Sequence, residues 1–252
     1  MALLPQIVRL GPTSYEQYTR CPRLFLLATL LRVPESDAGR SPDEGLLVHE
    51  VLRDVHHDGS CHDAAHVTTV LDARGADSQQ MRGYVERHRR RCPTAFERSA
   101  HEIDRVRFHR TPVPMFLASA RIDALWVHDG LLDVRDYKTG ALWYDDMQED
   151  PRARLQAWVM AEGAARRGLR LRLRYEFLQA EIDEDPSPWE PDADDLAAIE
   201  EELRAVVTRM WNDSDWRGVA EGDVCRTCRY RSICRDSAAP GEPTWPVLSL
   251  PS

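Results

Sequence analysis

Hydrophobic and polar positions alternate in the middle of the chain. Residues 100–109 place Ile103, Val106 and Phe108 among charged residues, and residues 113–127 form a longer, largely apolar run. Alternation of this kind is typical of a strand with one buried face. Asp129-Gly130 then predicts a tight hairpin turn, and it leads into residues 131–138, LLDVRDYK. We therefore expect a strand over 100–109 followed by an antiparallel hairpin of 113–127 and 131–138.

Helical spacing dominates the segments on either side of these strands. Ser41, Pro42 and Glu44 form a strong helix-start pattern, and Pro22 is expected to interrupt the first helical segment. The predicted helices cover residues 13–31, 41–57, 63–73, 77–91, 148–167 and 192–212, with a further strand over 171–182. This order of elements predicts an α/β fold in a single domain over residues 1–252, with residues 237–252 as a flexible tail.

Composition narrows the class of protein. An apolar fraction of 42% and a charged fraction of 30% are typical of a globular chain with a real core. No apolar run approaches the roughly 18 residues needed to span a membrane, and the N-terminus lacks the features of a secretory signal. We expect a cytoplasmic protein without membrane contact. The net charge of −9 argues against a uniformly basic surface, so nucleic acid would have to bind a local patch.

Lys138 is the only lysine in the chain, since the other basic residues are all arginine. Asp136 lies two residues earlier, so a strand places both side chains on one face. Asp123 lies as far before the hairpin turn as Asp136 lies after it, and cross-strand neighbours are about 5 Å apart. Two carboxylates at that separation repel unless they share a cation, for which Mg²⁺ or Mn²⁺ is suited. Together with a lysine, such a site fits phosphodiester hydrolysis; the simpler alternative is an Asp–Lys salt bridge.

Four of the nine histidines are considered as possible metal ligands. His49 shares a helical face with Gly45, Val48 and Leu52, where a histidine is usually a hydrogen-bonded core residue. The other three form a group with Cys61 that is close together in sequence and includes metal-ligating residue types: His57, Cys61, His62 and His66. It lacks a paired second motif, and we assign no metal to it.

Taken together, these motifs resemble the RecB-type branch of the PD-(D/E)XK nuclease superfamily. The matching features are G-x-x-x-H on a helix, an aspartate at a strand end, D-Y-K-T-G, and a helix with a glutamine: Gly45, His49, Asp123, Asp136, Lys138, Gly140 and Gln156. The resemblance implies a restriction-endonuclease-like core, a central mixed sheet flanked by helices. It also implies His49, Asp123, Asp136 and the Tyr137 carbonyl as metal ligands, with Glu102 as an additional acidic candidate. Catalytic roles fall to Asp123, Asp136, Lys138 (positioning the attacking water) and Gln156. Relatives usually have tyrosine where this chain has Met160.

Three cysteines near the C-terminus form C-x2-C-x5-C, namely Cys225, Cys228 and Cys234, and Cys21 lies near the N-terminus. This split arrangement resembles the iron–sulfur members of the branch, the CRISPR-associated RecB-like exonucleases and AddB nuclease domains. The resemblance implies one [4Fe–4S] cluster, held in a module of residues 13–33 and 214–236. Four thiolates also suit Zn²⁺, which stays open as an alternative. Cys61 and Cys92 are expected to be ordinary thiols.

The sequence thus leads to two functional hypotheses. The first is a Mg²⁺- or Mn²⁺-dependent DNA exonuclease that acts on single strands, ends or flaps. It would serve DNA repair or CRISPR adaptation in antiviral defence, beside an integrase or helicase partner. The second is a non-catalytic DNA-binding or scaffold subunit of a helicase–nuclease or integration complex. His49, Asp123, Asp136 and Lys138 are all present, which favours the first hypothesis.

Overall fold

The computed structural model of the chain describes residues 7–34, 43–57, 59–109, 114–139, 146–179 and 187–238. The chain divides into two compact units. The first comprises residues 1–40, 108–118 and 201–252, and the second comprises residues 41–107 and 119–200. The predicted helix start at Ser41 and Pro42, Gly140, and most of the tail after residue 237 lie outside the described residues.

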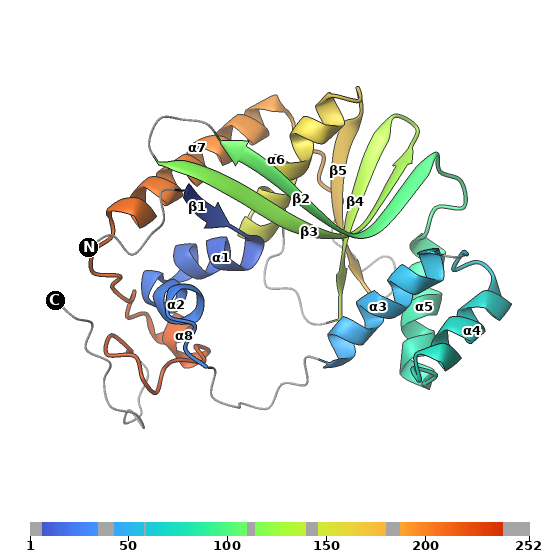
Figure 1. Ribbon diagram of the computed structural model, residues 1–252, viewed down its shortest axis with the longest axis horizontal. Coiled ribbons are helices and arrows are strands. Elements are labelled where there is room, and N and C mark those ends of the chain that lie inside the picture. The colour runs from blue at the N-terminus through green and yellow to red at the C-terminus, as the bar shows by residue number, and fades with distance from the viewer. Residues whose placement is uncertain are drawn as a thin grey trace. The chain divides into compact units, whose positions relative to one another are not determined.

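A mixed sheet forms the centre of the fold, as predicted (Figure 1). Its strands are β1 (Ile7–Leu10), β2 (Arg98–His109), β3 (Met115–His128), β4 (Leu131–Lys138) and β5 (Arg170–Phe177). Hydrogen bonding gives the order β1-β3-β4-β5, and β2 also pairs with β3. β3 and β4 are antiparallel, whereas the β1–β3 and β4–β5 pairs are parallel. The sheet is therefore mixed, and helices connect its parallel pairs.

The predicted hairpin between β3 and β4 is confirmed. Asp129 and Gly130 both adopt positive φ, at 50° and 70°, which is the backbone required by a type I′ turn of two residues. The register places Ala124 opposite Arg135 and His128 opposite Leu131. The strand β1 was not predicted, because its four residues, IVRL, are too few for alternation to stand out.

Four helices belong entirely to the second unit: α3 (Asp43–His57), α4 (Ala64–Ala73), α5 (Gln79–Arg91) and α6 (Pro151–Ala165). Three of them begin at side-chain caps, since Asp63, Ser78 and Asp150 each accept hydrogen bonds from backbone N–H groups of the first turn. In Figure 1, α3, α4 and α5 lie together as a helical group. These positions agree with the predicted helices to within about three residues.

The first unit contains α1 (Pro12–Arg20), α2 (Pro22–Phe25), a π-helical turn (Leu26–Leu30) and α8 (Gly222–Arg226). The predicted break at Pro22 is confirmed, with Cys21 in an extended conformation between α1 and α2. The long helix α7 (Ala193–Asn212) begins in the second unit and ends in the first. None of the described helices combines the length and the apolar character that crossing a membrane requires.

The core under the helical group is built from one stripe of α3. Val48, Val51, Leu52 and Val55 are fully buried and pack with residues of α4 and α5 and with Trp126 and Tyr137 of the sheet. This spacing is the helical period that the sequence shows. The stripe holds α3 in the orientation that brings His49 to the sheet.

We predict that Leu52→Ala lowers the free energy of unfolding by about 2–5 kcal/mol, because it removes a fully buried side chain and leaves a cavity. The matched control is Leu46→Ala on the same helix, where the residue is 61% exposed. The control should shift the free energy by less than about 0.5 kcal/mol. Denaturant unfolding followed by tryptophan fluorescence measures both. Equal effects would show that the α3 stripe is not a core element.

Candidate metal-dependent active site

The β3–β4 register brings two carboxylates together, as the sequence predicted. Ala124 is opposite Arg135, so Asp123 and Asp136 occupy the next pair of positions. The backbone N–H of Tyr137 donates a hydrogen bond of 2.8 Å to Asp123 Oδ2. Burial and the neighbouring charge of Asp136 raise the pKa of Asp123, and His49 offsets only part of that effect. The sheet therefore holds Asp123 where burial and a neighbouring carboxylate disfavour its charged form.

Helix α3 delivers His49 to these carboxylates. A Cβ on Gly45 would lie 3.3 Å from Thr139 Oγ1, so glycine allows the helix to approach the end of β4 closely. One turn later, His49 Nδ1 lies 3.3 Å from Asp123 Oδ1 and 3.3 Å from Glu102 Oε1. Burial lowers the pKa of His49, but hydrogen bonding and attraction to the two carboxylates outweigh it and raise the pKa to about 10. In the absence of another cation, the protonated imidazole partly neutralises the site.

Glu102 reaches the same point through an unusual backbone. It lies within β2 but has a φ of +51°, in the left-handed region that non-glycine residues rarely adopt. Strain of this kind is often found at functional sites. Arg121 Nε holds Glu102 Oε2 at 2.6 Å. The pKa of Glu102 is lowered, since the hydrogen bonds from His49 and Arg121 outweigh the effect of its burial. A positive φ at one residue cannot be read from a sequence pattern. The sequence therefore indicated Glu102 only as an additional candidate.

These three side chains suit a divalent cation. His49, Glu102 and Asp123 each offer one ligand atom, and the three atoms lie within 4.8 Å of one another. Glu102 Oε1 is buried, and its neighbour His49 Nδ1 lies at a long 3.3 Å, without the geometry of a good hydrogen bond. A cation could bind this oxygen and would relieve the repulsion between the carboxylates. The donor set, oxygen with one imidazole, fits Mg²⁺ or Mn²⁺.

Lys138 lies beside this donor set and is held from two sides. Its Nζ is 2.7 Å from Asp136 Oδ1, the salt bridge considered as the simpler alternative, and 4.7 Å from the centre of the Tyr175 ring. Tyr175 lies opposite Asp136 in the parallel β4–β5 register. Its hydroxyl donates a hydrogen bond to Asp150, the N-cap of α6. Tyr175 and Asp150 could not be predicted as site residues from the sequence, because β4 and β5 pair although helix α6 separates them along the chain.

Gln156 lies on the buried side of α6, as predicted. Its Nε2 is 3.5 Å from Asp136 Oδ2, a long contact that can orient this carboxylate. Met160, one turn further along α6, is buried in the core. The substitution of methionine for the usual tyrosine therefore falls at a packing position. The second unit thus gathers all six predicted side chains, a set that can bind a cation and a phosphate.

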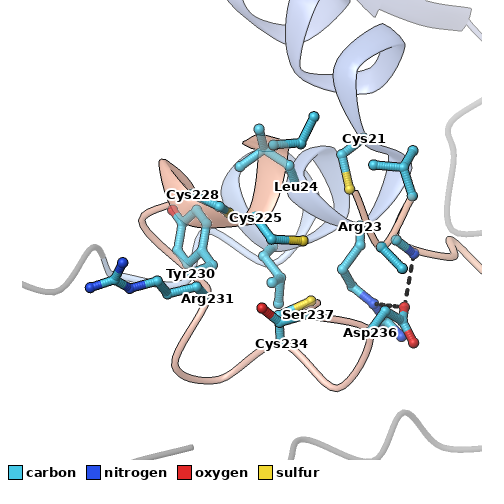
Figure 2. Close-up of a pocket in the computed structure, with 15 residues that line it drawn as sticks. Cys21, Arg23, Leu24, Cys225, Cys228, Tyr230, Arg231, Cys234, Asp236 and Ser237 are labelled. Carbon is cyan, nitrogen blue, oxygen red and sulfur yellow. Dashed lines mark hydrogen bonds and ion pairs between the residues drawn. The ribbon is translucent and has the colours of Figure 1, made fainter. Parts of the chain in front are cut away.

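Four predicted cysteines gather in the first unit. Cys21, Cys225, Cys228 and Cys234 line one pocket between α2 and α8. Figure 2 shows the sulfur atoms of Cys21, Cys225 and Cys234 pointing into it. Burial raises the pKa of the Cys228 and Cys234 thiols. Arg23 and Asp236 also line the pocket, and Arg23 Nε lies 3.2 Å from Asp236 Oδ2. Asp236 also accepts a hydrogen bond from the backbone N–H of Gly218. These contacts join helix α2 to the C-terminal segment that carries the other three cysteines.

The histidines near residue 60 do not form the group considered from the sequence. His62 is exposed, and His66 Nε2 contacts the carbonyl of Val55 at 3.0 Å. Cys61 instead lies with His56, His88 and Cys92. Cys61 and Cys92, expected to be ordinary thiols, thus lie close to two imidazoles.

Comparison with known proteins assigns the family. The model of the PD-(D/E)XK nuclease superfamily matches residues 9–235. A search of curated proteins found no match. One similar solved structure, titled "Crystal structure of SSO0001", is 14% identical over 92% of this chain and 88% of that chain, with a TM-score of 0.44. The family model, which covers most of the sequence, identifies this chain as a member of the PD-(D/E)XK nuclease superfamily.

Proposed function

We propose that the chain is a Mg²⁺- or Mn²⁺-dependent deoxyribonuclease. The observation that carries the proposal is the convergence of His49, Glu102 and Asp123 donor atoms beside the Asp136–Lys138 pair. Membership of a nuclease superfamily supports the same reaction class. The finer assignment, an exonuclease on single-stranded DNA, ends or flaps in DNA repair or CRISPR adaptation, rests on the sequence resemblance.

The donor atoms of His49, Glu102 and Asp123 converge, and the sequence resemblance adds Asp136 and the Tyr137 carbonyl to the ligand set. His49, Asp123, Asp136 and the Tyr137 carbonyl would hold the metal, with Glu102 as a further ligand. A bound Mg²⁺ or Mn²⁺ would supply charge that polarises a phosphate and lowers the pKa of a bound water. His49 would have to be neutral to act as a ligand, so it would give up the proton that His49 Nδ1 otherwise holds between Glu102 and Asp123.

Lys138 is suited to orienting the attacking water and to stabilising negative charge on the phosphate. Its ammonium is compact and can donate in several directions while remaining paired with Asp136. The Tyr175 ring limits where Nζ can move. Gln156 limits the rotation of the Asp136 carboxylate. Such fixed charges act strongly on a transition state because they need no rearrangement during the reaction.

The alternative is a non-catalytic DNA-binding or scaffold subunit. Such a subunit would have no need for a strained glutamate, a half-buried histidine and a positioned lysine at one point. The arrangement of the site therefore favours the enzyme. Absence of cleavage on any DNA substrate, with the protein fully folded and metal-loaded, would favour the scaffold.

We predict that purified protein degrades DNA in the presence of Mn²⁺ or Mg²⁺ and that a chelator stops the reaction. Lys138→Ala and Asp123→Ala should each reduce the rate at least about 100-fold, the size of effect seen when one transition-state donor is lost. The matched control is Asp129→Asn, because the Asp129 side chain is 93% exposed at the hairpin turn. End-labelled single- and double-stranded DNA, together with a circular single strand, would separate exonuclease from endonuclease cleavage. Activity that persists in both site variants would refute the site.

We further predict that Glu102→Gln weakens Mn²⁺ binding by about tenfold or more, because it removes one charged oxygen ligand. Asp104→Asn is the control, since Asp104 is exposed on the same strand. Calorimetric titration of the DNA-free protein measures both affinities. Equal affinities in wild type and Glu102→Gln would exclude Glu102 from the ligand set while leaving the other ligands untested by this variant.

We also propose that Cys21, Cys225, Cys228 and Cys234 bind a [4Fe–4S] cluster. The four cysteines line one pocket, so they can share one cofactor. Their arrangement, a C-x2-C-x5-C triplet with one distant cysteine, supports the cluster over zinc, because zinc ribbons usually present two C-x2-C pairs.

We predict that Cys228→Ser loses iron and the brown absorbance of the anaerobically prepared protein and lowers its thermal stability. The stability falls because the cluster joins Cys21 to a distant part of the chain and so restricts the unfolded state. Arg226→Ala, which removes an exposed side chain from the same segment, should retain both iron and colour. Iron analysis, absorbance and thermal unfolding provide the measurements. A Cys228→Ser protein that stays coloured would disprove the ligand assignment.

A further inference from the structure

A second group of metal-ligating side chains lies in the second unit, away from the carboxylates. His56 is near the end of α3, Cys61 follows that helix, and His88 and Cys92 lie at the end of α5. One ligand atom from each lies within 4.8 Å of all the others. His56 Nε2 is 2.8 Å from His88 Nε2, and Cys92 Sγ is 3.8 Å from His56 Nε2. His88, Cys61 and Cys92 are buried.

The surroundings of His88 orient it as a ligand. Its Nδ1 lies 2.6 Å from Glu176 Oε1, and both residues are fully buried. Arg135 Nη1 holds the other oxygen of Glu176 at 3.2 Å. A carboxylate beside Nδ1 keeps the proton on that nitrogen. The lone pair of Nε2 then points toward His56 and Cys92. Histidines bound to metals commonly have a carboxylate partner of this kind.

His56 is also held in place. The His101 ring stacks on it, with centroids 4.5 Å apart and planes 5° from parallel. His101 offers no ligand atom to the group. Its ring fixes the plane of the His56 imidazole, so that His56 Nε2 faces His88 and Cys92. Two imidazoles are thus oriented before any ion binds.

Two thiols and two imidazoles form a donor set that suits tetrahedral Zn²⁺. Bonds of about 2.3 Å to sulfur and about 2.0 Å to nitrogen place neighbouring donors about 3.3–3.8 Å apart. The two Nε2 atoms would need to separate by about half an ångström to reach this geometry. The sequence spacing is also suitable, because His56 and Cys61 come from one helix end and His88 and Cys92 lie one helical turn apart.

We propose that His56, Cys61, His88 and Cys92 bind one structural Zn²⁺. All four positions are filled by protein, so the ion has no open site for substrate and serves to join α3 to α5. His49 lies two turns before His56 on α3, and the ion would therefore stabilise the helix that carries it. This assignment does not depend on nuclease activity or on the cluster of the first unit.

The test is metal analysis of the full-length protein, purified without chelators. We expect Cys61→Ser and Cys92→Ser to contain one zinc per chain fewer than the wild type, with iron unchanged. His62→Ser is the matched control, because His62 is the exposed neighbour of Cys61, and it should keep wild-type zinc. Zinc content that is the same in wild type and Cys61→Ser would overturn the proposal.

X-ray absorption at the zinc edge of the wild-type protein provides a test that does not depend on the folding of a variant. The expected shell contains two sulfur and two imidazole nitrogen ligands. A shell of four sulfurs would place the zinc at the other cysteines, and an absence of zinc would leave the site without its ion; either result contradicts the proposal. Intact mass of the unreduced, denatured protein tests whether Cys61 and Cys92 form a disulfide. Such a disulfide would leave neither thiol able to bind zinc and would also contradict the proposal.

Discussion

The site depends on the pairing of β3 with β4, which holds Asp123 next to Asp136. Two carboxylates in a partly buried position repel, and each of their neighbours reduces that repulsion. His49 on α3 contacts Asp123, and Lys138 on β4 pairs with Asp136. The backbone N–H of Tyr137 donates a hydrogen bond to Asp123. The close approach of α3 at Gly45 matters because it brings His49 to the hairpin, and Asp150 matters because it holds Tyr175, whose ring lies beside Lys138.

Strand β4 carries different chemistry on its two faces. Asp136 and Lys138 face Tyr175 and Gln156, whereas Arg135 and Tyr137 pack toward Trp126 and His88. The second face includes a buried charge network, in which Arg135 pairs with Asp133 and Glu176. Removing one member of such a network leaves an unpaired buried charge. The geometry of the face that carries Asp136 and Lys138 therefore depends on complete ion pairing on the opposite face.

The sequence predicted the parts of the fold that depend on local pattern. Asp129-Gly130 and the alternation around it gave the hairpin, its register and the pairing of Asp123 with Asp136. The rest depends on contacts between distant segments or on single backbone angles. Glu102 is turned into the site by one positive φ, and Tyr175 reaches Lys138 through a parallel register. His56 shares its helical face with Leu52, a signal that favours it over His57, but Cys61 and Cys92 meet only through the packing of α3 against α5.

The two-residue turn at Asp129 and Gly130 has a consequence for changes in chain length. Exposed turns usually accept insertions and deletions with little effect, and the Asp129 side chain is almost fully exposed. Here one added or deleted residue would shift β4 by one position against β3, and a shift of one position reverses the faces of a strand. An insertion would place Arg135 and Tyr137 where Asp136 and Lys138 now lie beside Asp123, and a deletion would place Tyr137 and Thr139 there. The length of this short surface loop thus sets which side chains of β4 lie beside Asp123, so the loop is constrained although it is exposed.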